Sequence, residues 1–150
     1  MEKIITVFIV ALVFFIGARF FQYLKKSKNP PTKNLYFESN RKALEFYNSI
    51  YPVSMSNNML NVGIVRSKDR TGDGKFHFLV ELSDQQNVSG FNDKYSDEIN
   101  VGDLIYWGFI EKVDEKNIIQ IQAIGHVLAL LEHEFNPNTK KLVVKKDLTK

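Results

Sequence analysis

The spacing of apolar residues changes twice along the chain, and each change predicts a new element. Residues 4–18 form an apolar run in which Thr6 is the only polar side chain. Apolar residues then recur at the helical spacing i, i+3, i+4, i+7, at Ala43, Phe46, Tyr47 and Ile50. Beyond residue 58 the spacing shortens to two, which is typical of strands. The pattern predicts an apolar helix, a short amphipathic helix and a β-rich domain.

The first apolar segment is long enough to cross a bilayer. Residues 4–24 reach about 30 Å as a helix, which matches the hydrocarbon thickness. Arg19 can extend toward the headgroups, and aromatic side chains suit the interface. The residues assigned to the anchor and its interface are Ile4, Phe8, Phe14, Phe15, Arg19, Phe20, Phe21, Tyr23, Lys25, Lys26 and Lys28. We therefore expect a single-pass transmembrane helix.

Two other interpretations of this segment stay open. A cleaved secretory signal would also have a basic start and an apolar stretch, but a cut after Ala18 would place the bulky Ile16 three residues before the cut. A buried helix of a globular protein would be expected to keep a polar face. The anchor is the interpretation that fits best.

The charges beside the apolar segment predict its orientation. Residues 1–33 hold six basic residues and one acidic residue, and most of the basic residues follow the apolar segment. By the positive-inside rule the C-terminal domain then lies in the cytoplasm, at a bacterial inner membrane. Because very short N-terminal tails can break this rule, the periplasmic or extracellular side stays open.

The sequence predicts four parts in order. They are a tail at 1–3, the transmembrane helix at 4–24, a basic, proline-containing linker at 25–38 and a β-rich domain with a leading helix at 39–150. Pro30 and Pro31 end the first helix. The amphipathic helix is expected at about 40–51, with Ser39 or Asn40 as its N-cap and Pro52 after its end.

The remaining pattern predicts five or six antiparallel strands. Segments 62–65, 76–82, 104–113, 118–124, 126–135 and 142–144 are expected as strands, with a polar turn at 67–75 and a loop at 83–92. The segment 126–135 is also compatible with a helix, and Gly125 is expected at a bulge or corner. The strand 104–113 is apolar on both faces, as in a central strand or a closed barrel. The predicted fold is mainly β, a small antiparallel barrel or sandwich of the OB or SH3-like kind.

A short motif accompanies this layout. The turn Val101-Gly102-Asp103 leads into an aromatic strand. A membrane helix followed by such a domain resembles uncharacterised bacterial single-pass membrane proteins with a small OB/SH3-like β-barrel. The resemblance implies a membrane-anchored domain and transfers no functional residue.

Charge and composition exclude several classes of function. Residues 34–150 hold 14 basic and 16 acidic residues, so the folded part lacks the dense positive charge that a nucleic-acid binder needs. The chain has no cysteine, which excludes a disulfide scaffold, a thiol nucleophile and thiolate metal sites. No motif indicates a cofactor.

Two groups of residues are weak metal candidates. Asp69 and Asp73 occupy positions one and five of a calcium-loop pattern, but Val80 stands where the bidentate carboxylate is needed. His126 and His133 are seven residues apart, so they share a face on a helix and oppose each other on a strand. A metal or general-base role at the histidines is therefore tied to a helical structure of this segment.

These observations favour a non-catalytic, membrane-anchored protein-interaction module, such as an assembly factor or regulator. The expected partners are the membrane and one unidentified protein. One alternative is an immunity protein whose acidic surface neutralises a cationic toxin. A second alternative is an enzyme that uses His126 and His133. The sequence leaves the oligomeric state open.

Overall fold

The computed structural model describes residues 32–56, 59–113 and 119–150. Its elements are β1 (Leu35–Tyr36), α2 (Asn40–Ile50), β2 (Asn61–Arg70), β3 (Phe76–Ser83), β4 (Gln86–Phe91), the 3₁₀ turn η1 (Ser96–Glu98), β5 (Leu104–Val113), β6 (Ile119–Asn136) and β7 (Lys141–Asp147). The predicted anchor at 4–24 lies outside the described residues. Among the described helices, none has the length and hydropathy needed to span a bilayer.

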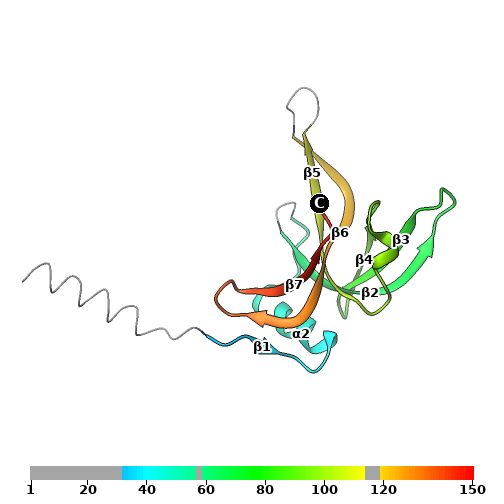
Figure 1. The fold of residues 1–150 in the computed structure, drawn as a ribbon. Helices are drawn as coiled ribbons and strands as arrows, with labels where there is room; N and C mark the ends of the chain where they lie inside the picture. Colours follow the sequence, from blue (N-terminus) through cyan, green and yellow to red (C-terminus); the bar gives the residue numbers. More distant parts are fainter. Residues whose placement is uncertain (1–31, 57–58, 114–118) are drawn as a thin grey trace, which may run out of the picture. The chain divides into compact units, whose positions relative to one another are not determined.

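Five strands close into a barrel (Figure 1). β2, β3 and β4 form an antiparallel meander, and β5 pairs antiparallel with both β2 and β6. The barrel closes where β4 pairs with β6 at Phe91 and His126. This pair is parallel, whereas the other strand pairs described are antiparallel, so the predicted antiparallel barrel is confirmed except at the pair that closes it. The closed ring decides for a barrel and against a sandwich.

The long strand β6 also carries the two strands outside the barrel. Beyond the barrel, β1 pairs with β6 at Leu35 and Phe135, and β7 returns along β6 after the turn at 137–140. The segment 126–135 is therefore a strand, which confirms the first of the two expected conformations. β1 lies within the predicted linker, where two residues give no periodic pattern to detect.

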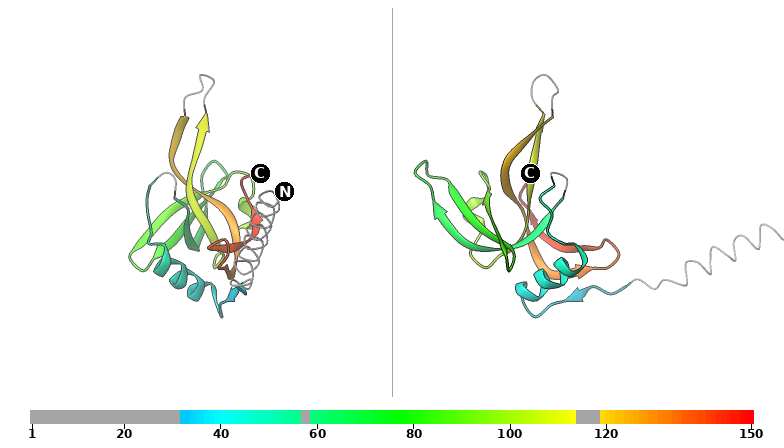
Figure 2. Two further views of the ribbon diagram at one scale, coloured as in Figure 1. Left: turned by 90° about the vertical axis from the view of Figure 1, so that its left-hand side faces the viewer. Right: turned by 180° about the vertical axis from the view of Figure 1, so that it is seen from behind.

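Apolar side chains form two cores on opposite sides of the barrel wall. The inner core fills the barrel and includes Phe78, Ile105 and Trp107. The outer core lies between the barrel and α2, and it includes Leu44 and Tyr106. β5 contributes to both because its successive side chains point to opposite faces, which explains the predicted strand that is apolar on both faces. Figure 2 shows α2 on the outside of the barrel, beside β6.

The amphipathic helix begins where the sequence predicts. The Ser39 hydroxyl accepts a hydrogen bond from the backbone N–H of Lys42, so Ser39 is the N-cap, and Tyr51 is the C-cap. Ala43, Leu44 and Tyr47 are buried against the barrel. Ala43 and Tyr47 of the predicted stripe therefore pack on the domain, with Phe46 partly buried beside them. The prediction was wrong for Ile50, which is 44% exposed at the end of the helix, and it omitted the buried Leu44.

Two strand boundaries differ from the sequence-based prediction. β2 continues to Arg70, because its polar end pairs with β3 and the Lys68 ammonium lies 4.6 Å from the centre of the Phe76 ring. The expected loop at 83–92 contains β4. Gln86–Phe91 lacks apolar alternation, and its conformation is fixed by backbone pairing with β3 rather than by local propensity.

A buried carboxylate joins α2 to the barrel. Glu81, which is 7% exposed, accepts hydrogen bonds of 2.5 and 3.2 Å from the Arg41 guanidinium and another from Nε of Arg66. The hydrogen bonds from Arg41 are the main cause that lowers the pKa of Glu81 below its usual value. Burial of Glu81 opposes this effect, and the hydrogen bond from Arg66 adds to it. The ion pair therefore stabilises the folded chain only while Glu81 is ionised.

We expect Glu81→Gln to lower the free energy of unfolding at pH 7 by about 1–2 kcal/mol, because charge-assisted hydrogen bonds are lost while the partly exposed arginines regain water. The folded pKa lies below the unfolded value, so this contribution is present above about pH 4.3 and disappears as pH falls through the folded pKa. Urea unfolding of the full chain in detergent, followed by fluorescence of Trp107, measures both effects. Glu45→Gln, at an exposed pair with Lys42, is the control. Equal acid sensitivity of Glu81→Gln and the wild type would contradict the assignment.

Candidate functional site: a tyrosine-lined pocket

A pocket of about 360 Å³ lies between the C-terminal end of α2, β5 and the turn between β6 and β7. Its lining residues are Tyr47, Tyr51, Pro52, Met59, Leu60, Tyr106, Thr139, Lys140 and Lys141. We call it the tyrosine pocket. Its volume is within the usual range for ligand sites, about 300–1,000 Å³.

Three tyrosines from two elements line part of the pocket. Tyr47 and Tyr51 lie one helical turn apart, with ring centres separated by 5.0 Å. The rings of Tyr47 and Tyr106 meet edge to face at 6.4 Å. Tyr47 and Tyr106 are also buried in the outer core. The same residues therefore hold α2 on the barrel and form the base of the pocket.

The Tyr106 hydroxyl has unused hydrogen-bonding capacity. The residue is 4% exposed, and its hydroxyl makes no hydrogen bond to any described residue. Burial is the main cause that raises the pKa of Tyr106, and the neighbouring Tyr47 hydroxyl adds to it. The hydroxyl therefore stays protonated at neutral pH.

One side of the pocket is apolar and partly open to solvent. Met59 and Leu60 are 44% and 43% exposed. Asn61 directly follows Leu60, and its side-chain amide donates to the carbonyl of Ser54 at 2.7 Å and accepts a hydrogen bond from the N–H of Ser54 at 2.9 Å. Asn61 is itself buried. Met59 and Leu60 therefore lie directly before a buried, hydrogen-bonded residue.

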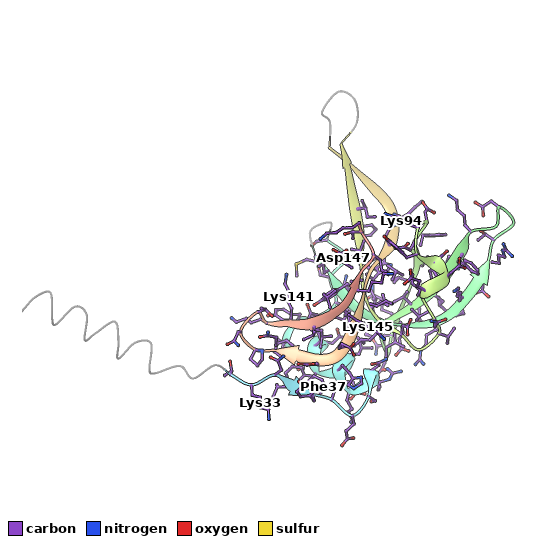
Figure 3. The ribbon with its side chains drawn as sticks, viewed as in Figure 1. Lys33, Phe37, Lys94, Lys141, Lys145 and Asp147 are labelled. Carbon is purple, nitrogen blue, oxygen red and sulfur yellow. The ribbon has the colours of Figure 1, made fainter. Side chains whose placement is uncertain are left out.

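The opposite side carries two positive charges. Lys140 and Lys141 follow a turn in which the Asn136 side-chain oxygen accepts from the backbone N–H groups of Asn138 and Thr139. Lys140 has φ 56°, a left-handed conformation that is uncommon outside glycine. Figure 3 labels Lys141 at the start of β7 and Lys145 farther along it. Within the described ranges, neither Lys140 nor Lys141 forms an ion pair, whereas Lys42, Lys75, Lys146 and Lys150 do.

Asp69 and Asp73, the acidic metal candidates, form hydrogen bonds within the hairpin of β2 and β3. The Asp73 carboxylate accepts hydrogen bonds from the Thr71 hydroxyl and from the backbone N–H of Lys75, and the bond from Thr71 is the main cause that lowers the pKa of Asp73. Asp69 accepts from Ser67 at 2.8 Å. The contacts of Asp73 close the turn between β2 and β3, whereas the contact of Asp69 lies within β2, so the two carboxylates have separate hydrogen-bond partners.

The two histidine candidates lie far apart. His126 and His133 belong to β6, and seven residues of strand span about 23 Å. His133 lines a polar pocket of about 260 Å³ with Glu98, Asp103, Glu132 and Lys145. Across the described residues, no three His, Asp or Glu side chains come together as a metal site would require. The helix on which the two histidines would share a face is not formed.

Comparison of the chain with known protein families, with curated proteins and with solved structures finds no match. The resemblance to bacterial single-pass proteins therefore stays a prediction. The site has to be interpreted from its own geometry.

Sequence reasoning did not identify the tyrosine pocket. It placed Tyr47 in the apolar stripe of a helix and Tyr106 in the strand 104–113, which is apolar on both faces, and it assigned no role to the two lysines. Each assignment is locally consistent, because the outer core does bury Tyr47 and Tyr106. The pocket joins residues from 47 to 141, and only adjacent lysines in an otherwise acidic domain hint at it.

Proposed function

We propose that the chain is a non-catalytic protein-interaction module, held at a membrane by residues 4–24, and that its barrel domain binds a protein partner at the tyrosine pocket. The observation that carries this proposal is the exposed pair Met59 and Leu60 beside an aromatic pocket. Well-packed aromatic pockets with apolar surroundings are where protein interfaces concentrate their affinity. Anchoring raises the local concentration of the domain for partners at the same membrane.

We propose further that the barrel is of the OB kind. Its first strand, β2, pairs with the second and the fourth, β3 and β5, and its third, β4, pairs in parallel with the fifth, β6. This order supports the OB alternative over the SH3-like one. OB barrels serve many functions, so the fold alone does not select a partner.

Site-specific photocrosslinking of the full chain in native membranes tests the function. A benzophenone side chain in place of Met59 is expected to crosslink to one partner, and the additional substitution Leu60→Glu is expected to abolish this adduct. The anchor is tested separately: the chain is expected to stay in the membranes after a carbonate wash. Mass spectrometry of the adduct then separates a toxin from an assembly partner.

Leu79 provides the matched control position, because it is an exposed apolar residue on β3 with 37% exposure. The same photocrosslinker at position 79 is expected to give no adduct. Identical adducts from both positions would indicate unspecific contact and refute the proposal. Absence of any adduct from position 59 in cells that grow normally would refute it as well.

A further inference from the structure

We propose that the tyrosine pocket binds the C-terminal residue of a partner polypeptide. The α-carboxylate would lie at Lys140 and Lys141, and an apolar side chain would pack against Met59, Leu60 and the tyrosine rings. This inference rests on the proposed function, because it names the part of the partner that the pocket takes.

Charge supports an anionic ligand. The residues that line the pocket include two lysines and no aspartate or glutamate. Residues 34–150 as a whole carry more acidic than basic side chains, so the pocket is a local exception. Four of the described lysines, Lys42, Lys75, Lys146 and Lys150, have an acidic group within 4 Å, and neither pocket lysine has one. The charges of Lys140 and Lys141 therefore have no carboxylate of the described chain to neutralise them, and a ligand can supply one.

The size of the pocket supports a single residue as occupant. About 360 Å³ holds one large side chain with its carboxylate, and the apolar and cationic linings belong to the same cavity. A chain terminus carries its α-carboxylate and its side chain on one carbon, so it offers both groups within a few ångströms. An internal acidic residue would need a neighbouring residue for the apolar contact and two exits for the chain.

The polar groups of the pocket are held before a ligand arrives. The turn fixed by Asn136 sets the left-handed backbone at Lys140, and such uncommon conformations of non-glycine residues are frequent at binding sites. Tyr47 and Tyr106, which are buried in the outer core, form a wall that is in place before a ligand arrives. A site that is already in its binding conformation takes a ligand with less loss of conformational entropy.

Peptide titration of the ¹⁵N-labelled full chain in detergent micelles tests the inference. The probe is Gly-Ser-Gly-Phe with a free C-terminus, compared with the same peptide as its C-terminal amide and with Gly-Asp-Phe-Gly amide, which carries an internal carboxylate. We expect saturable shifts of the backbone amides of Tyr51, Tyr106 and Lys141 with the free-carboxylate peptide. Both other peptides should bind at least about tenfold more weakly, the size of one charge-assisted contact.

Two variants connect the binding to the lysines. Lys140→Gln combined with Lys141→Gln should weaken the free-carboxylate peptide about tenfold and leave the amide unchanged, whereas Lys145→Gln on the same strand should change neither. Equal binding of acid and amide, tighter binding of the internal carboxylate, or no saturable shift would each overturn the inference. A crosslinked partner at Met59 would still support the proposed function in those cases, so the two failures can be distinguished.

Discussion

Replacing Phe78 with alanine is expected to lower the free energy of unfolding by about 3–5 kcal/mol. Phe78 is fully buried, with 0% exposure, at the centre of the inner core. Truncation removes apolar contacts and leaves a cavity that the closed strands around it can fill only in part. Urea unfolding of the full chain in detergent, followed through Trp107, the single tryptophan of the chain, measures the loss.

The adjacent residue gives a close control for this experiment. Leu79 is next in the same strand, points to the opposite face and is 37% exposed. Leu79→Ala is therefore expected to change stability by less than about 1 kcal/mol. Similar losses for the two variants would mean that β3 does not separate an inner from an outer face, which would contradict the barrel.

The second large effect is expected at Gly125, where an alanine has no space. A Cβ at this position would lie 2.1–2.5 Å from three atoms of the Trp107 indole. Trp107 is 3% exposed, and its indole N–H donates to the carbonyl of Ser89 at 2.9 Å, so the ring cannot move without breaking that bond. We expect Gly125→Ala to destabilise the fold by about 3 kcal/mol, at the upper end for overpacking.

The control for Gly125 is a glycine with open surroundings. No heavy atom lies within 4 Å of a Cβ built at Gly72, in the turn between β2 and β3. Gly72→Ala is expected to change the unfolding free energy by less than about 1 kcal/mol in either direction. The Trp107 emission spectrum should shift in Gly125→Ala alone. An unchanged spectrum and stability of that variant would show that β6 passes farther from Trp107.

The surroundings of Gly125 could be predicted from the sequence only in part. The sequence predicts a bulge or corner at this glycine, and the pairing of β5 with β6 does shift register between Phe109 and Glu111, opposite this stretch of β6. The sequence pattern does not show that the ring of Trp107 lies against Gly125. Trp107 stands 18 positions earlier, and only the register between the strands places its ring there.

The sequence-based predictions were incomplete where contacts in the folded chain override the local residue pattern. Gln86–Phe91 has the composition of a loop, and it is a strand because β3 and β6 supply its partners. The calcium pattern around Asp69 and Asp73 matches part of a spacing, but hydrogen bonds within the hairpin occupy those carboxylates. Backbone pairing with strands distant in the sequence decides the first case, and local side-chain hydrogen bonds decide the second.

Local periodicity by itself determined the helix at Asn40–Ile50 and the strands β3 and β5. These features depend on neighbouring residues, which fix the exposed and buried faces of an element wherever it packs. The parallel contact between β4 and β6, which closes the barrel, and the meeting of Tyr47, Tyr106 and Lys141 around one pocket were decided only in the tertiary structure. Both join residues tens of positions apart, and the register that brings them together is a property of the whole packed chain.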